Sequence, residues 1–143
     1  SKAVQDGAMV KEYVAMVHGL PPESGDWEDL LWKDSRKNKV YVVKRERSGV
    51  KKARLEFIRL SAGECSLVRV RLHTGRSHQI RVQFASRKHP LWGDGKYGSR
   101  QKGSIALQSC GLRFVHPDTG KPMAFSLPLP AAAPWKEFLE LGE

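Results

Sequence analysis

Alternating apolar and polar positions predict the first strands of this chain. Residues 10–17 alternate and are rich in β-branched and aromatic side chains, which is typical of a strand. The glycine and two prolines within residues 19–22 end this segment, because proline cannot donate to a sheet ladder. After an acidic stretch at 23–29, for which no element is predicted, residues 39–43 form a short predicted strand.

The next two segments have the period of half-buried strands. One face of residues 51–60 carries Ala53, Leu55 and Phe57. One face of residues 67–72 carries Val68, Val70 and Leu72, and Arg69 and Arg71 lie on its opposite face. The sequence Ser-Ala-Gly-Glu at 61–64 favours a turn between these segments. The two strands are therefore predicted to form a hairpin.

Helical spacing replaces alternation after Thr74-Gly75. Apolar residues in 77–87 recur at the spacing of a helix, with Ile80 and Phe84 four apart. The remaining predicted elements are strands at 104–109, 112–115 and 122–127, the tail of a helix at 2–9, and a short helix at 135–141. The pattern predicts a single α+β domain over residues 1–143, with a mixed, mainly antiparallel sheet and few helices.

Positive charge is the unusual property of the composition. The chain has 25 Lys and Arg against 15 Asp and Glu, a formal net charge of +10. Residues 36–54 hold nine Lys and Arg with Glu46 as their only acid, and residues 69–88 hold six with no acid. Arg76 lies between a predicted strand end and a predicted helix start, where no acid balances it. Nucleic acid is the first candidate partner and an anionic membrane surface the second.

Several kinds of chemistry lack their motifs in these 143 residues. There is no GxSxG, no HExxH and no Walker-type phosphate loop, so we expect no metal and no cofactor. Asp94, in Gly93-Asp94-Gly95, is interpreted as a turn former. Cys65 and Cys110 lack metal-ligand spacing and are expected to be reduced thiols. With no apolar run of about 18 residues and no signal-like N-terminus, we expect a cytoplasmic protein without a membrane partner, or an organellar one in a eukaryote.

Motifs along the whole chain resemble those of the RluA-type RNA pseudouridine synthases. TGRSHQIRV at 74–82, HPLWGD at 89–94 and KYG at 96–98 are similar to the family's TGRxHQIRVH…HPxxGDxxYG signature. KEYVAMVHG at 11–19 is similar to its KxYxAxVxG motif, and IALQS at 105–109 to its LHA segment, with Gln-Ser where His-Ala is common. The resemblance implies the family's catalytic-domain fold and the conversion of uridine to pseudouridine in rRNA or tRNA.

The resemblance also implies a role for individual residues. Tyr13 would lie against the target base and remove the proton from carbon 5, and Arg81 would pair with the catalytic aspartate. Ile105 and Leu107 would form the apolar floor of the base pocket. The residues expected to contact RNA are Arg76, His78, Lys96 and Tyr97. We expect the RNA-bound protein to be a monomer, and the uridine to leave its stack before reaction.

The family's nucleophilic aspartate, in an HRLDxxTSG motif upstream of the tyrosine, does not occur in residues 1–143. We therefore expect this chain to be the C-terminal portion of a synthase catalytic domain, inactive by itself, with Arg81 unpaired within it. The alternative from another class is a non-catalytic RNA-binding protein on the same scaffold. A general basic ligand-binding domain is a third reading, which requires the motif match to be accidental.

Overall fold

The computed structural model describes residues 9–101, 103–115 and 122–126. Its elements are β1 (Met9–His18), β2 (Ser24–Asp34), β3 (Lys39–Val43), β4 (Val50–Arg59), β5 (Cys65–Leu72), α2 (Gln79–Ala85), the 3-10 helix η1 (Gly95–Tyr97), β6 (Leu107–Val115) and β7 (Pro122–Ser126). The predicted helix at 135–141 lies outside the described residues. So does the helix tail predicted at 2–9, apart from Met9, which begins β1.

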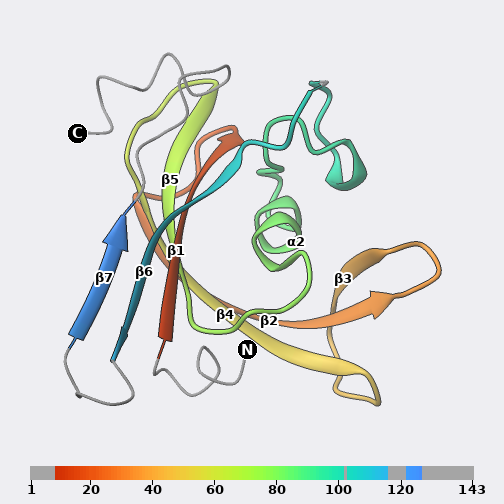
Figure 1. The fold of residues 1–143 in the computed structure, drawn as a ribbon. Coiled ribbons are helices and arrows are strands. Elements are labelled where there is room, and N and C mark those ends of the chain that lie inside the picture. Colours follow the sequence, from red (N-terminus) through yellow and green to blue (C-terminus); the bar gives the residue numbers. More distant parts are fainter. Residues whose placement is uncertain (1–8, 102, 116–121, 127–143) are drawn as a thin grey trace.

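One sheet contains all the described strands. Their order is β3-β2-β4-β5-β1-β6-β7, and every pairing is antiparallel. The helix α2 packs on one face of this sheet, against residues of β1, β4 and β5, and lies to the right of β1 and β5 in Figure 1. The predicted fold, an α+β domain with a mainly antiparallel sheet and few helices, is confirmed.

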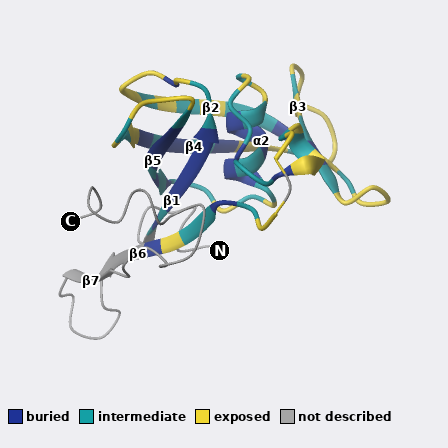
Figure 2. Ribbon diagram, turned by 90° about the horizontal axis from the view of Figure 1, so that it is seen from above, coloured by how far each residue is buried: buried dark blue, intermediate teal, exposed yellow. Residues whose placement is uncertain are grey.

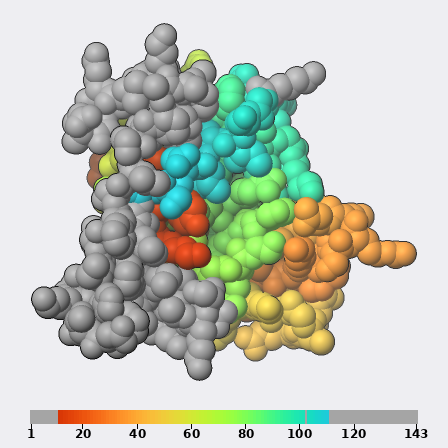
Figure 3. All heavy atoms as spheres, in the orientation of Figure 1, coloured from red at the N-terminus to blue at the C-terminus, as the bar shows by residue number. Residues whose placement is uncertain are grey.

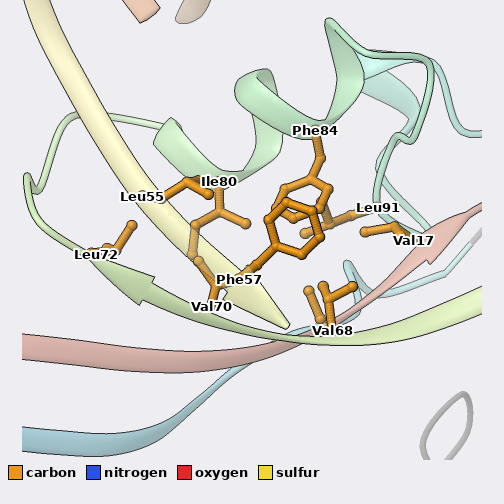
Figure 4. Packing of buried hydrophobic residues seen from close by; sticks show 10 residues of the cluster. Val17, Leu55, Phe57, Val68, Val70, Leu72, Ile80, Phe84 and Leu91 are labelled. Atoms are coloured by element: carbon orange, nitrogen blue, oxygen red, sulfur yellow. The ribbon is translucent and has the colours of Figure 1, made fainter. Parts of the chain in front are cut away.

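The main core fills the space between α2 and the sheet. The alternation of β4 and β5 places Leu55, Phe57 and Val70 on the face that meets Ile80 and Phe84 of the helix (Figure 4). Trp27 packs edge-on against Phe84, with ring centroids 4.8 Å apart. Figure 2 shows buried residues gathered where α2 meets the sheet, and exposed residues at the turns that flank β3. The alternation therefore orients β4 and β5 as predicted.

Two predicted features differ in the structure. The acidic stretch 23–29 belongs to the long strand β2, and the strands predicted at 104–109 and 112–115 are the single strand β6. Asp26 lies on β2 opposite Glu56, where the guanidinium of Arg54 bonds it through two nitrogens at 2.9 and 2.8 Å. A partner on the neighbouring strand thus balances an acid that looks unfavourable for a strand in the sequence alone.

The segment between α2 and β6 is fastened to the end of β1. Trp92 N–H donates to Met16 O (2.8 Å), and Met16 N–H donates to Ala106 O (3.0 Å). Gly93 has φ +82°, and a Cβ there would lie 2.3 Å from the carbonyl oxygen of Ser104. Only glycine fits this close approach, which fixes the position of Asp94. Over the described residues, no helix has the length and apolarity needed to cross a bilayer.

Candidate active site

A hollow of about 230 Å³ lies where β1, the β5–α2 connection, α2 and β6 meet. In Figure 3, atoms of β1 (red) are exposed between those of β6 and those of the β5–α2 segment (green). The hollow is lined by Tyr13, Leu72, Arg76, His78, Gln79, Ile80, Arg81 and Leu107. Five residues that the sequence singled out, from three separate motifs, thus share one small site.

Tyr13 enters the hollow from the middle of β1. It pairs with Val70 of β5 and Ser109 of β6, next to an irregularity in the β1–β6 register between Glu12 and Tyr13. The ring is partly buried and packs against the main core. Burial raises the pKa of the Tyr13 phenol, because the phenolate would lose solvation. At neutral pH Tyr13 is therefore the uncharged phenol, which must pass on its own proton before it can accept one.

Arg81 lies on α2 and is held by Asp94. Arg81 Nε donates to Asp94 Oδ2 (2.8 Å) and Nη2 donates to Oδ1 (3.0 Å). The Asp94 side chain is 1% exposed and that of Arg81 17%. The hydrogen bond to Asp94 raises the pKa of Arg81. Arg81 is thus paired within this chain, and Asp94 is a buried ionic partner beyond its place in the turn, which corrects both expectations from the sequence.

The other edge of the Arg81 guanidinium can still donate a hydrogen bond. Within the described part of the chain, Nη1 has no hydrogen-bond partner, although a guanidinium can donate from both of its edges. The guanidinium carbon also lies 5.0 Å from the centroid of the Tyr97 ring. Arg81 is fixed in place by Asp94 and Tyr97 and keeps a donor for a second acceptor.

Tyr97 and Lys96 use their polar groups inside the protein. Tyr97 Oη accepts from Val40 N–H (2.8 Å) and lies 2.7 Å from His78 Nδ1. Lys96 Nζ donates to Asn38 O (2.9 Å) in the β2–β3 turn. These bonds tie η1 to the edge strand β3. Contact of these two residues with RNA stays a prediction. Both also stabilise the packing of η1 against β3 and the β2–β3 turn.

Leu107 and Ile105 take different positions beside the hollow. Leu107 forms part of its wall, at the start of β6. Ile105 precedes that strand and, like Tyr13 and Leu107, is partly buried against the main core. Leu107 thus supplies apolar surface to the hollow, whereas Ile105 packs with the core rather than in the wall, and a base pocket formed by these residues stays a prediction.

Gln79 is a buried residue of the site that the sequence analysis did not single out. Its Oε1 accepts from Thr74 Oγ1 (2.8 Å) and from Arg76 N–H (3.0 Å), and its Nε2 donates to Arg54 O (3.1 Å). Thr74 Oγ1 in turn accepts from Arg54 N–H (2.9 Å). This network joins the β5–α2 turn to β4, and it explains why threonine and glutamine flank Arg76 five residues apart.

The arginines of residues 69–88 are mostly paired with acids from elsewhere in the chain. Arg69 and Arg71 meet Glu12 on the face of the sheet opposite Tyr13, and Arg87 meets Asp29. Arg76 differs, since its Nε donates to Lys52 O (2.7 Å) and none of the described carboxylates pairs with it. Among the arginines of residues 69–88, Arg76 is therefore the one that no described carboxylate pairs with.

Comparison with known proteins identifies the family. The sequence profile of one family, described as RNA pseudouridylate synthase, matches residues 1–86, more than half of the chain. The chain belongs to this family. Its synthase motifs are those that surround the hollow, from Tyr13 on β1 to Arg81 on α2.

Curated synthases are similar in sequence to most of this chain. An uncharacterized RNA pseudouridine synthase of Chloroflexus aurantiacus is 37% identical over 129 residues, which cover 86% of this chain and 40% of the relative. Ribosomal large subunit pseudouridine synthase D of Vibrio vulnificus is 31% identical over 147 residues, 90% of this chain and 44% of the relative. The chain thus spans less than half the length of these relatives.

A solved synthase structure has the same fold. Human RNA Pseudouridylate Synthase Domain Containing 1 superposes with a TM-score of 0.75 and 20% identity, over 92% of this chain and 59% of that one. The pseudouridine synthase fold predicted from the motifs is therefore confirmed.

A second hollow of the synthase fold adjoins the first at Arg76. It measures about 430 Å³, and its charged lining residues are Lys33, Lys51 and Arg76, with no carboxylate among the described residues that line it. Lys51 of β4 belongs to the basic cluster at 36–54 and Arg76 to that at 69–88, so the two clusters meet here, and Lys33 of β2 adds a third cation. Arg76 thus stands between an apolar-walled site and a cationic groove.

Proposed function

We propose that this chain forms the C-terminal part of the catalytic domain of an RNA pseudouridine synthase and holds the target uridine in the hollow at Tyr13. The observation that carries this proposal is the convergence of Tyr13, Arg81 and Leu107 on one small site. An aromatic ring and an aliphatic wall suit the faces of a base that has left its stack.

The proposed reaction is an isomerisation, which rearranges the bonds of one uridine without a net gain or loss of atoms. The bond between N1 of uracil and C1′ of the ribose breaks, the base turns, and a bond forms between C5 and C1′. C5 then loses its proton and N1 gains one. Tyr13 Oη is the proposed acceptor of the C5 proton; the neutral phenol would pass its own proton to solvent water as it accepts, and water would supply the proton that N1 gains. The partial burial of Tyr13, which raises the pKa of its phenol, favours such a coupled transfer over a free phenolate.

Arg81 is the proposed partner of the family's aspartate nucleophile. With Asp94 bound to its Nε edge, Nη1 can donate to a second carboxylate, which keeps that carboxylate ionised and oriented. The pair with Asp94 supports this role, because it fixes the guanidinium before any other group arrives.

The groove of Lys33, Lys51 and Arg76 is the proposed path of the RNA backbone next to the uridine. Three cations with no carboxylate among the described lining residues suit phosphates, and Arg76 borders both hollows. We further propose rRNA or tRNA as the substrate, a monomer as the active form and the cytoplasm as its place. The name of the Vibrio relative favours large-subunit rRNA.

Mapping of pseudouridine in cellular RNA tests the proposed function. The gene with its full reading frame is deleted in its host, and pseudouridines in rRNA and tRNA are mapped with and without a plasmid copy. We expect one or a few sites to lose the modification and to regain it with the plasmid. An unchanged map, in a protein that still binds RNA, would instead favour the non-catalytic RNA-binding protein.

A further inference from the structure

His78 occupies an unusual backbone position at the edge of the site. It precedes α2 with φ 52° and ψ 23°, in the left-handed region that few non-glycine residues adopt. Its side chain makes no capping bond to the helix. The ring instead lies edge-on to Tyr97, with centroids 5.7 Å apart, and borders the hollow with Tyr13 and Arg81. The strained backbone thus directs the imidazole to these groups.

The hydrogen bonds of Tyr97 favour one tautomer of His78. Val40 N–H can only donate, so Tyr97 Oη accepts from it. The phenol proton is then best used toward His78 Nδ1, 2.7 Å away, since the opposite arrangement would leave the Tyr97 O–H without an acceptor among the described residues. With Nδ1 as the acceptor, the imidazole proton lies on Nε2.

The surroundings of His78 favour an uncharged ring. Burial, and then the positive charges of Arg81, Lys96 and Lys33, lower the pKa of His78, against a smaller opposite effect of Asp94. Among the described residues no group accepts from Nε2. His78 is thus a neutral side chain with one donor at the border of the base site.

We propose that His78 Nε2–H donates to the O4 carbonyl of the target uracil, and that Tyr97 is the positioning residue that fixes this donor. The inference rests on the proposed function, because it takes the hollow as the base site. Uracil accepts at O4, whereas cytosine has an amino donor there, which would oppose the N–H of His78. A site built around one such bond discriminates between the two bases by leaving a polar group unpaired with the wrong one.

The tautomer can be measured before any ligand is added. Protein with 15N-labelled histidine gives separate signals for Nδ1 and Nε2, and comparison with His78→Gln assigns those of His78 among the five histidines. At neutral pH we expect an unprotonated Nδ1 and a protonated Nε2. A ring protonated on Nδ1, or on both nitrogens, would overturn the proposal.

Uridine and cytidine 5′-monophosphates then test the specificity. We expect UMP to shift the His78 Nε2 signal and to bind more tightly than CMP, with a preference that falls about fivefold in His78→Ala, as expected for one net hydrogen bond. Tyr97→Phe should weaken the preference in the same direction. His73→Gln, a change at a partly buried histidine outside the hollow, is the matched control and should leave it intact.

Three results would contradict the proposal: no UMP-dependent change at His78 Nε2, equal preference in His78→Ala and the unaltered protein, or loss of preference in His73→Gln alone. The proposed function is judged separately by pseudouridine formation. If the modification depends on this gene while His78→Ala keeps the preference for UMP, the role of His78 is wrong and the synthase function stands.

Discussion

The side chains of Arg81 and Asp94 form an ion pair with two hydrogen bonds, 2.8 Å between Nε and Oδ2 and 3.0 Å between Nη2 and Oδ1. They come from α2 and from the turn before η1, thirteen residues apart. Because Asp94 is almost fully buried, its carboxylate depends on Arg81 for compensation of its charge. The pair thus joins the helix of the site to the segment that carries Tyr97.

Removal of Arg81 should destabilise the fold. Arg81→Met leaves the buried Asp94 carboxylate uncompensated, and we expect a loss of about 3 kcal/mol in the free energy of unfolding, at the low end for a buried pair because Arg81 is partly exposed. Urea denaturation followed by circular dichroism measures this. Asp94→Asn added to Arg81→Met should recover part of the loss, since the neutral amide needs no counter-charge.

Arg87→Met is the matched control for this prediction. Arg87 also pairs with an acid through two nitrogens, but Asp29 keeps a bond from Gln83 Nε2 (2.9 Å) when the arginine is removed. The two side chains of this pair are 30% and 13% exposed, against 17% and 1% for Arg81 and Asp94, so its loss should be smaller, about 1 kcal/mol. Equal, small losses in the two variants, with no recovery from Asp94→Asn, would mean that the ion pair of Arg81 stabilises the fold no more than that of Arg87.

Binding of RNA should weaken steeply with salt, and Arg76 should contribute to that dependence. If Arg76 contacts a phosphate, Arg76→Gln lowers affinity for a labelled oligouridylate and reduces the slope of log K against log salt by about one. Fluorescence anisotropy at several potassium chloride concentrations measures the slope.

The paired arginine Arg87 again provides the comparison. Arg87→Gln removes the same formal charge from a residue already bound to Asp29, so the slope should stay within error of the unaltered protein. If both variants change the slope equally, the dependence reflects net charge and not a phosphate site at Arg76.

Most of the central strands could be predicted from the sequence, because apolar and polar residues alternate in a strand that buries one face. The strands around Leu55 and Val70 were predicted for this reason. The strand β2 was not predicted, because its acidic residues look unfavourable for a strand. Asp26 is balanced by Arg54, 28 residues away, and no local pattern contains that bond. Register between strands decides such pairs, and register is not visible in one strand alone.

The motifs singled out Tyr13, Arg81 and Leu107, which the fold brings to one hollow, but the hydrogen bonds and ion pairs of the site were not predicted. Asp94 was read as a turn former since its neighbours are glycines, and only the packing of the turn on α2 shows the ionic role. Gln79 likewise looks like an ordinary polar helix residue until its three partners, on β4 and in the turn, are known.

The central claim is that Tyr13 acts on the hydrogen at C5 of a uridine held in this site. The most direct measurement is release of tritium from RNA labelled at C5 of uridine, since that hydrogen leaves when C5 bonds to the ribose. Unaltered protein from the full reading frame and its Tyr13→Phe variant are compared in one assay with RNA binding. We expect binding within about twofold and a release rate lower by at least about 10²-fold, the size of a lost general base. Tritium release by Tyr13→Phe at the unaltered rate would contradict the account.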